Sequence, residues 1–375
     1  MTRAEGASGQ IFAHRPLFTL AALYGAAVVP LGTLGYAGRL PVWQMPSYWH
    51  GHEMLFGFAL AVVGGYLLTR LGRIQLGIAV VLWLLGRAVA AIEGIPPALS
   101  IPAALAYPVC LFVLAGLPLL RAAKRWRNLV FAPLLGAFVL AELLFQAGAA
   151  GWVPDGEMRG LLFALSVVAM LLFLMGGRVT AAAASGAMQR AGAPHRDMAQ
   201  GRVETAGVAG LAAMAVGLVV GLSWLTAIGA AAALICATAR LLRWAPVAHW
   251  RRPELLALML GYGWLAAGAA LLLATAVGRA PVADALHGIA AGALGTLSAA
   301  MMTRVSLQRT RRPIALSAPT RAAILCVGLA ALARLLVLAG EPQRLALLGT
   351  AAALWSAAFL IVAAEVWRAR PPRAR

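Results

Sequence analysis

The chain has 375 residues, of which 62% are hydrophobic and 11% are charged. Soluble domains have roughly half apolar and about a quarter charged residues. The formal net charge of +19 would suit nucleic acid only if the basic residues gathered on one face of a soluble fold. Here they lie between long apolar blocks. The composition therefore excludes a water-soluble domain and a nucleic-acid partner, and it predicts a protein that resides in the lipid bilayer.

Twelve apolar windows are long enough to cross the hydrocarbon core, which takes about 20 residues. The boundary between the seventh and eighth is the weakest, because only Leu222 and Ser223 separate them. We predict an all-α polytopic bundle of about 12 spans at 17–367, forming a single membrane domain over 1–375 with a short tail at 1–16 and a basic tail at 368–375. The windows are 17–37, 49–70, 74–92, 97–120, 129–150, 160–184, 203–221, 223–242, 254–276, 283–303, 319–340 and 344–367.

The basic residues test this count. Most of the 31 Lys and Arg residues fall in the two tails and in every second connection, and the other connections hold few. Positively charged connections stay in the cytoplasm, so the pattern predicts a cytoplasmic N-terminus and a cytoplasmic C-terminus. Arg87 and Arg334 fall within spans. We expect a multi-pass membrane protein.

Polar side chains inside the spans gather at one expected depth. Ionisable groups within a membrane are costly and usually face the bundle interior. Given the predicted orientation, residues from distant spans converge on the outer half of the bilayer. They are His50, His52 and Glu53 of the second span, Arg87 of the third, Glu142 and Gln146 of the fifth, Asp284 and His287 of the tenth, and Arg334 of the eleventh.

Histidine is the commonest metal ligand in proteins. Two imidazoles from facing helices can hold a heme iron in a bundle core, which makes His50, His52 and His287 candidate ligands. Helical geometry sets His50 and His52 about 200° apart, so both cannot point at one centre. The competing interpretation is that each histidine is interfacial or satisfied by neighbours.

The charged groups near these histidines leave two interpretations open. Glu53, Glu142 and Arg87 suit either a structural ion pair or a proton path. Arg178 and Arg304 end inward-running spans, where they suit topological anchoring or contact with a phosphate or propionate. Three cysteines lie far apart in apolar blocks and predict no metal or disulfide pair.

Several segments, in chain order, resemble those of the NnrS family. The most specific is W-H-G-H-E-M-L-F-G-F at 49–58, which continues to G-G-Y-L-L-T at 64–69. The others are H-R-P-L-F at 14–18, L-W-L-L-G-R at 82–87, R-N-L at 127–129, G-G-R-V at 176–179, H-G-I-A-A-G-A-L-G-T at 287–296, and R-V-S-L at 304–307 followed by Thr310, Arg312 and Pro313.

The resemblance implies a twelve-span bacterial inner-membrane protein with heme and copper, tied to the nitric oxide response, nitrosative stress and denitrification. By position, His50, His52 and His287 are the implied ligands, and Arg15, Arg87, Arg178 and Arg304 match the family's arginines. Gln146 and Arg309 stand where the family usually has histidines, which puts the copper in question. The alternatives are a proton-coupled secondary transporter and a non-catalytic accessory protein of a respiratory metalloenzyme.

Overall fold

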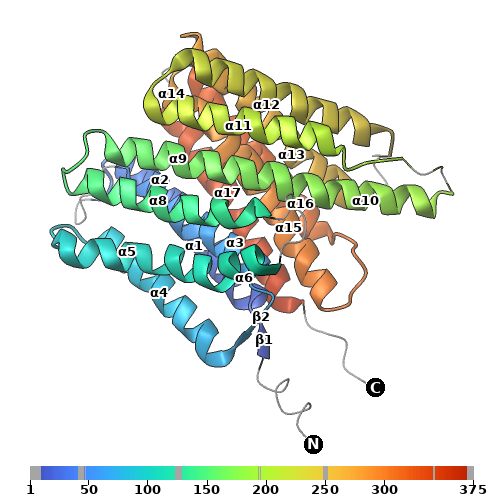
Figure 1. The fold of residues 1–375 in the computed structure, drawn as a ribbon, viewed down its shortest axis with the longest axis horizontal. Coiled ribbons are helices and arrows are strands. Elements are labelled where there is room, and N and C mark those ends of the chain that lie inside the picture. Colours follow the sequence, from blue (N-terminus) through green and yellow to red (C-terminus); the bar gives the residue numbers. More distant parts are fainter. Residues whose placement is uncertain are drawn as a thin grey trace, which may run out of the picture. The chain divides into compact units, whose positions relative to one another are not determined.

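The fold is described from a computed structural model. It describes residues 10–40, 46, 48–122, 129–192, 194, 196–247, 252–340 and 343–369. Within these residues the chain is almost entirely helical, apart from one pair of short antiparallel strands, β1 (Gln10–Phe12) and β2 (Arg70–Gly72). The chain divides into two compact units, each of which is described separately (Figure 1).

The first unit comprises Met1–Ala164 together with Val366–Arg370. Its strand pair joins the segment before the first helix to the connection that precedes α4. Its helices are α1 (His14–Tyr36), α2 (Trp49–His52), α3 (Leu60–Leu67), α4 (Arg73–Ala91), α5 (Pro97–Leu111), α6 (Leu117–Ala122), α8 (Phe131–Ala149) and the first part of α9 (Gly156–Leu171), with π-helices η2 (Glu53–Ala59) and η3 (Phe112–Gly116).

The second unit comprises Leu165–Glu365 and Pro371–Arg375. Its long helices α11 and α12 lie side by side (Figure 1). Its elements are the rest of α9, η4 (Leu172–Gly176), α10 (Gly177–Arg190), α11 (Gly201–Val220), α12 (Ser223–Trp244), η5 (Ala245–Val247), α13 (Pro253–Ala276), α14 (Val282–Ala285), η6 (Gly288–Ala293), α15 (Leu294–Arg309), α16 (Ala318–Leu336), η7 (Val337–Ala339) and α17 (Arg344–Arg368).

The structure confirms the all-α class and the predicted spans. Among the described residues, 11 helical runs are long and apolar enough to cross a membrane. The remaining predicted span is the run α2–η2–α3, whose first turns carry His50, His52 and Glu53. The weakest boundary is a true break, because Gly221 adopts a left-handed φ of 82° between α11 and α12. The single membrane domain and the cytoplasmic ends stay predictions.

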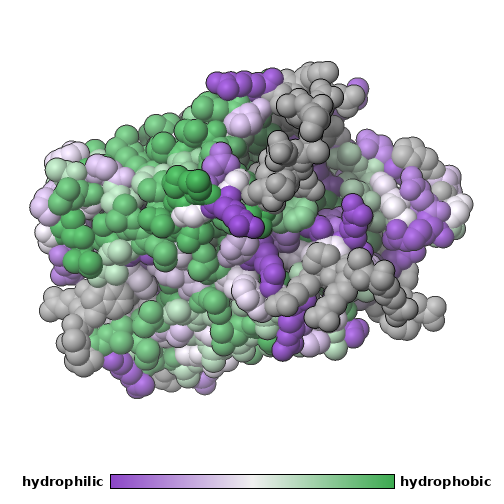
Figure 2. Space-filling view, turned by 90° about the horizontal axis from the view of Figure 1, so that it is seen from below, coloured by the Kyte–Doolittle hydropathy of each residue, from purple (hydrophilic) through white to green (hydrophobic). Residues whose placement is uncertain are grey.

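Apolar side chains cover wide areas of the surface, as Figure 2 shows. Many large ones are exposed on α4, where Ile74, Val81 and Leu84 are examples. A water-soluble protein rarely exposes such continuous apolar surface. In this protein, lipid chains are the natural cover.

Four π-helical turns interrupt the long helices of the described part of the chain. A π-turn shifts the backbone hydrogen bonds by one residue, and such turns often lie at functional sites. The turn η2 follows His52, η6 follows His287, and η4 ends next to the Gly177–Arg178 pair. Three of the four therefore lie beside residues that the sequence singles out.

Candidate functional site

Three segments of the first unit bring charged side chains together in its interior. The α2–η2 run contributes His52 and Glu53, α4 contributes Arg87, and α8 contributes Glu142. His52, Glu53 and Glu142 are almost completely buried, and Arg87 is 9% exposed. Buried charges are stable only when they are paired and hydrogen-bonded, so the contacts among these four groups decide what the cluster can do.

His52 lies between the two carboxylates. Its Nδ1 is 2.7 Å from Glu53 Oε1, and its Nε2 lies 3.0 Å and 3.1 Å from the two oxygens of Glu142. An ionised carboxylate can only accept hydrogen bonds, so this arrangement suits an imidazole ring that donates from both nitrogens. The ring is held between Phe56 and Phe145, with centroid distances of 4.9 Å and 4.5 Å.

Glu53 links the histidine to Arg87. Arg87 Nε lies 3.2 Å from Glu53 Oε2, and the Tyr24 hydroxyl donates to the same carboxylate. Gly57 makes room for this contact, because a Cβ at Gly57 would lie 2.7 Å from both Arg87 Nη1 and Tyr24 Cε1. The Gly57 carbonyl, within η2, accepts a hydrogen bond from Trp83 Nε1 at 3.0 Å.

These contacts show the ion pair that the sequence suggests, and the proton path stays a prediction. Glu53 and Arg87 form an ion pair, whereas Glu142 contacts His52 and accepts a 2.8 Å hydrogen bond from Gln146 Nε2. The cluster therefore forms a continuous chain of contacts from Gln146 to Arg87. Sequence reasoning named its four ionisable members but missed Tyr24, which has no distinguishing pattern in an apolar helix.

His50 points elsewhere. A Cβ on Gly32 of α1 would lie 2.6 Å from His50 Nδ1, so the imidazole packs directly against the α1 backbone. His52, by contrast, faces the carboxylates from α8 and η2. The two side chains thus diverge, as the helical spacing predicts.

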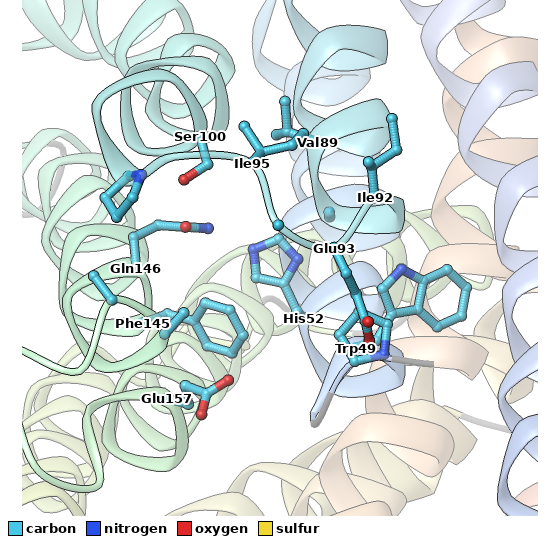
Figure 3. Close-up of a pocket in the computed structure, with 16 residues that line it drawn as sticks. Trp49, His52, Val89, Ile92, Glu93, Ile95, Ser100, Phe145, Gln146 and Glu157 are labelled. Atoms are coloured by element: carbon cyan, nitrogen blue, oxygen red, sulfur yellow. The ribbon is translucent and has the colours of Figure 1, made fainter. Parts of the chain in front are cut away.

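A cavity of about 390 Å³ adjoins the buried cluster. Figure 3 shows His52, Phe145 and Gln146 pointing into it, with Glu157 of α9 and Ser100 of α5 on its walls. The segment between α4 and α5, which includes Glu93, forms another wall. The cavity gives His52 and Gln146 a route to small molecules.

In the second unit, His287 is positioned by its own backbone. His287 Nδ1 lies 2.8 Å from the Ala283 carbonyl. A carbonyl oxygen can only accept, so Nδ1 carries the proton and the neutral ring bears its lone pair on Nε2. One turn away, Asp284 Oδ1 pairs with Arg334 Nη1 at 2.9 Å. His50 and His52 belong to the first unit, so a pairing of either with His287 stays a prediction.

A second buried cluster in this unit holds Arg178. Its Nη2 lies 2.9 Å from Glu204 Oε1, and Arg240 Nη2 lies 3.5 Å from Glu204 Oε2. Arg240 Nη1 donates to the Phe173 carbonyl in η4 and to the Tyr262 hydroxyl, at 3.1 Å and 3.0 Å. Arg240 is completely buried. It lies within α12 and inside the predicted span 223–242, and the sequence pattern gave it no role.

Arg304 lies near the end of α15. Arg309, which stands where the family usually has a histidine, lies there too. Arg304 is partly exposed there, and Arg309 is the last residue of the helix. The role suggested for Arg304 and the consequence of Arg309 for a copper site stay predictions. Among the described residues, no group of three or more His, Cys, Asp or Glu side chains is arranged so that it could hold a metal ion, and in the His52 cluster the carboxylates contact the ring nitrogens directly.

The fold and these buried polar clusters define a multi-pass helical membrane protein with an internal cavity. The family model described as "NnrS protein" matches residues 11–370. The chain therefore belongs to the NnrS family, which supports a membrane protein of the nitric oxide response in general terms. The comparison with curated proteins finds no match.

Proposed function

We propose that the protein binds heme and acts in the response of a bacterial inner membrane to nitric oxide and nitrosative stress, alongside denitrification. His287 carries the proposal. Its Nδ1 donates to the Ala283 carbonyl, and metal-ligating histidines typically donate their other ring nitrogen in this way. The Nε2 lone pair is then oriented for a metal, at the point where η6 begins.

The donor set fits heme better than it fits copper. Heme iron needs only one or two axial ligands from the protein, and a single well-oriented imidazole can supply one. A copper site typically takes two or three ligands of the His and Cys type, whereas the described contacts of the His52 ring nitrogens are the carboxylates of Glu53 and Glu142. Copper stays a prediction from the family resemblance alone.

The second ligand position is open to His50 or His52 in the proposal. His52 would first have to release a carboxylate, because Glu53 and Glu142 each contact one of its ring nitrogens. Arg178 is already paired with Glu204, so a contact from Arg178 to a heme propionate would compete with that pair. We therefore assign only His287 a direct role.

A bound heme iron would supply a coordination position for nitric oxide, a small apolar gas that dissolves in the bilayer. The chain's own contribution would be to hold the imidazole through the Ala283 carbonyl. The Asp284–Arg334 pair lies one turn away on the same segment and would restrain its position.

The test is an absorption spectrum of the detergent-purified protein, oxidised and reduced, for wild type and His287→Ala. His249→Ala is the matched control, because His249 lies in a predicted cytoplasmic connection outside the described residues. We expect a Soret band in wild type and His249→Ala, and a lost or shifted band in His287→Ala.

A folded, colourless wild type from heme-sufficient cells would contradict heme binding and would favour the transporter or accessory alternative. An identical Soret band in His287→Ala would instead show that heme is held by other ligands.

A further inference from the structure

Two hollows meet in the first unit. The cavity of about 390 Å³ beside His52 lies inside the bundle, and a groove of about 740 Å³ runs between α4 and α5. They share four lining residues from the end of α4 and the following turn, namely Val89, Glu93, Gly94 and Ile95. One molecule could therefore occupy both hollows.

Apolar and polar residues both line the cavity, and the polar ones include two carboxylates and His52. Ser100, Gln146, Glu93 and Glu157 line it, and no Lys or Arg is among its described lining residues. Trp49 and Phe145 add flat aromatic faces to the same cavity. Such a site suits an aromatic ring with hydroxyl groups, because carboxylate and amide oxygens accept hydrogen bonds and aromatic faces pack on the ring.

The groove has the opposite character. Except for Glu93, its lining is apolar, and it includes Leu85, Leu99, Pro102 and Ala103. Leu85 and Leu99 are 42% and 65% exposed on the outside of the helices, where lipid chains would contact them. An apolar tail can therefore leave the cavity along the groove and remain in hydrocarbon.

We propose that these two hollows bind a membrane quinol, with its ring in the cavity and its isoprenoid tail in the groove. The cavity volume falls within the range usual for small-molecule sites. The quinol hydroxyls would donate to the oxygens of Glu93, Glu157 or Gln146. A phospholipid has a similar tail, but its phosphate would face the carboxylates of Glu93 and Glu157. His52, the basic side chain among the described lining residues, already contacts Glu53 and Glu142. Like charges in close approach exclude the wrong ligand.

This inference goes beyond the proposed function and does not depend on it, because the binding measurement reads no metal. The protein is placed in phosphatidylcholine nanodiscs under anaerobic conditions and titrated with decylbenzoquinol or with duroquinol, which has no long tail. The signal is the quenching of Trp49 fluorescence, taken as the difference between the protein and its Trp49→Phe variant. Trp49 lines the cavity, so a ring bound there would quench it.

Three variants separate the two hollows. Ala103→Trp fills the groove, so it should weaken decylbenzoquinol binding by at least about tenfold. The affinity for duroquinol, which has no long tail, should change by less than about twofold. Leu99→Trp fills the same groove and replaces Ala103→Trp if that variant does not fold. Gln146→Leu alters the cavity and should weaken both quinols by about fivefold or more. Val81→Trp is the control, since Val81 is exposed on α4 and lines neither hollow. These effects correspond to roughly 1 kcal/mol or more for each altered hollow.

Saturable quenching with this pattern would support the quinol site. Three results would overturn it: no quenching beyond that of Trp49→Phe, equal decylbenzoquinol affinity in wild type and both groove variants, or displacement of the quinol by phosphatidylglycerol. The last result would show that the hollows bind a lipid headgroup.

Discussion

The ion pair between Glu53 and Arg87 makes the sharpest prediction about stability. Replacing Glu53 with Gln keeps the shape of the side chain but removes its charge. Arg87 would then keep a buried guanidinium without the carboxylate that lies 3.2 Å from its Nε. At an effective dielectric constant of about 20, two unit charges at this distance attract by roughly 5 kcal/mol.

Mutational data on buried pairs give a similar magnitude. Removing one partner typically costs about 3–5 kcal/mol, because the other charge stays buried and uncompensated. We expect Glu53→Gln to cost this much in unfolding free energy. Arg87→Met should also destabilise, but the double variant should be more stable than the sum of the two effects implies, with a coupling of about 1.5–3 kcal/mol.

The assay is reversible unfolding in mixed micelles by titration with sodium dodecyl sulfate, followed by circular dichroism. The Asp284–Arg334 pair is the comparison, because its side chains are 11% and 16% exposed, whereas those of Glu53 and Arg87 are 0% and 9% exposed. The cost of removing one partner rises with burial. Asp284→Asn should therefore cost less than Glu53→Gln. A coupling below about 0.5 kcal/mol between Glu53 and Arg87 would refute the buried pair.

Two further predictions concern close packing and a buried hydroxyl. Gly57→Ala should destabilise the protein by about 1–3 kcal/mol, because the new Cβ would lie 2.7 Å from Arg87 Nη1 and overpacking has this cost. The control is Gly77→Ala, which has nothing within 4 Å of the new Cβ and should be neutral or stabilising in the same unfolding assay. Equal effects of the two substitutions would contradict the close packing at Gly57. Tyr262→Phe should lower the unfolding free energy by about 1–3 kcal/mol, because the completely buried Arg240 would lose a hydrogen-bond partner at 3.0 Å. A change below about 0.5 kcal/mol would show that this hydrogen bond is not formed.

The spans could be predicted because their cause is local. Each needs only a long run of apolar residues, and the helix ends in the structure lie within a few residues of most predicted windows. The largest differences are at Gly156–Arg190 and Val282–Arg309, which extend several residues beyond their windows. Helix α1 begins at His14 instead of Leu17.

The contacts within the site depend on helices that are distant in sequence. The depth argument named His52, Glu53, Arg87 and Glu142 as residues of one level, but it could not say that Glu142 contacts His52 instead of Arg87. Side-chain direction is the missing information, because a shared depth in the membrane does not say which neighbouring helix a side chain faces.

Arg240 shows a second limit of sequence reasoning. It lies inside the predicted span 223–242, and an apolar window does not show which helix a basic side chain within it would face. In the structure its guanidinium lies near Phe173, Trp244 and Tyr262, at 5.0–5.5 Å from their ring centroids. Glu204 lies near the start of the predicted span 203–221. An acidic residue at that position was the available signal that a basic side chain such as Arg240 would be buried beside it.

The central claim is that the protein presents a heme iron to nitric oxide, and an anaerobic nitric oxide titration of the reduced, purified protein tests it most directly. We predict that the Soret band shifts on addition of nitric oxide and saturates at about one equivalent per heme. We also predict that His287→Ala loses or alters this response, whereas His249→Ala keeps it. A heme-loaded wild type whose spectrum does not change with nitric oxide would contradict the account.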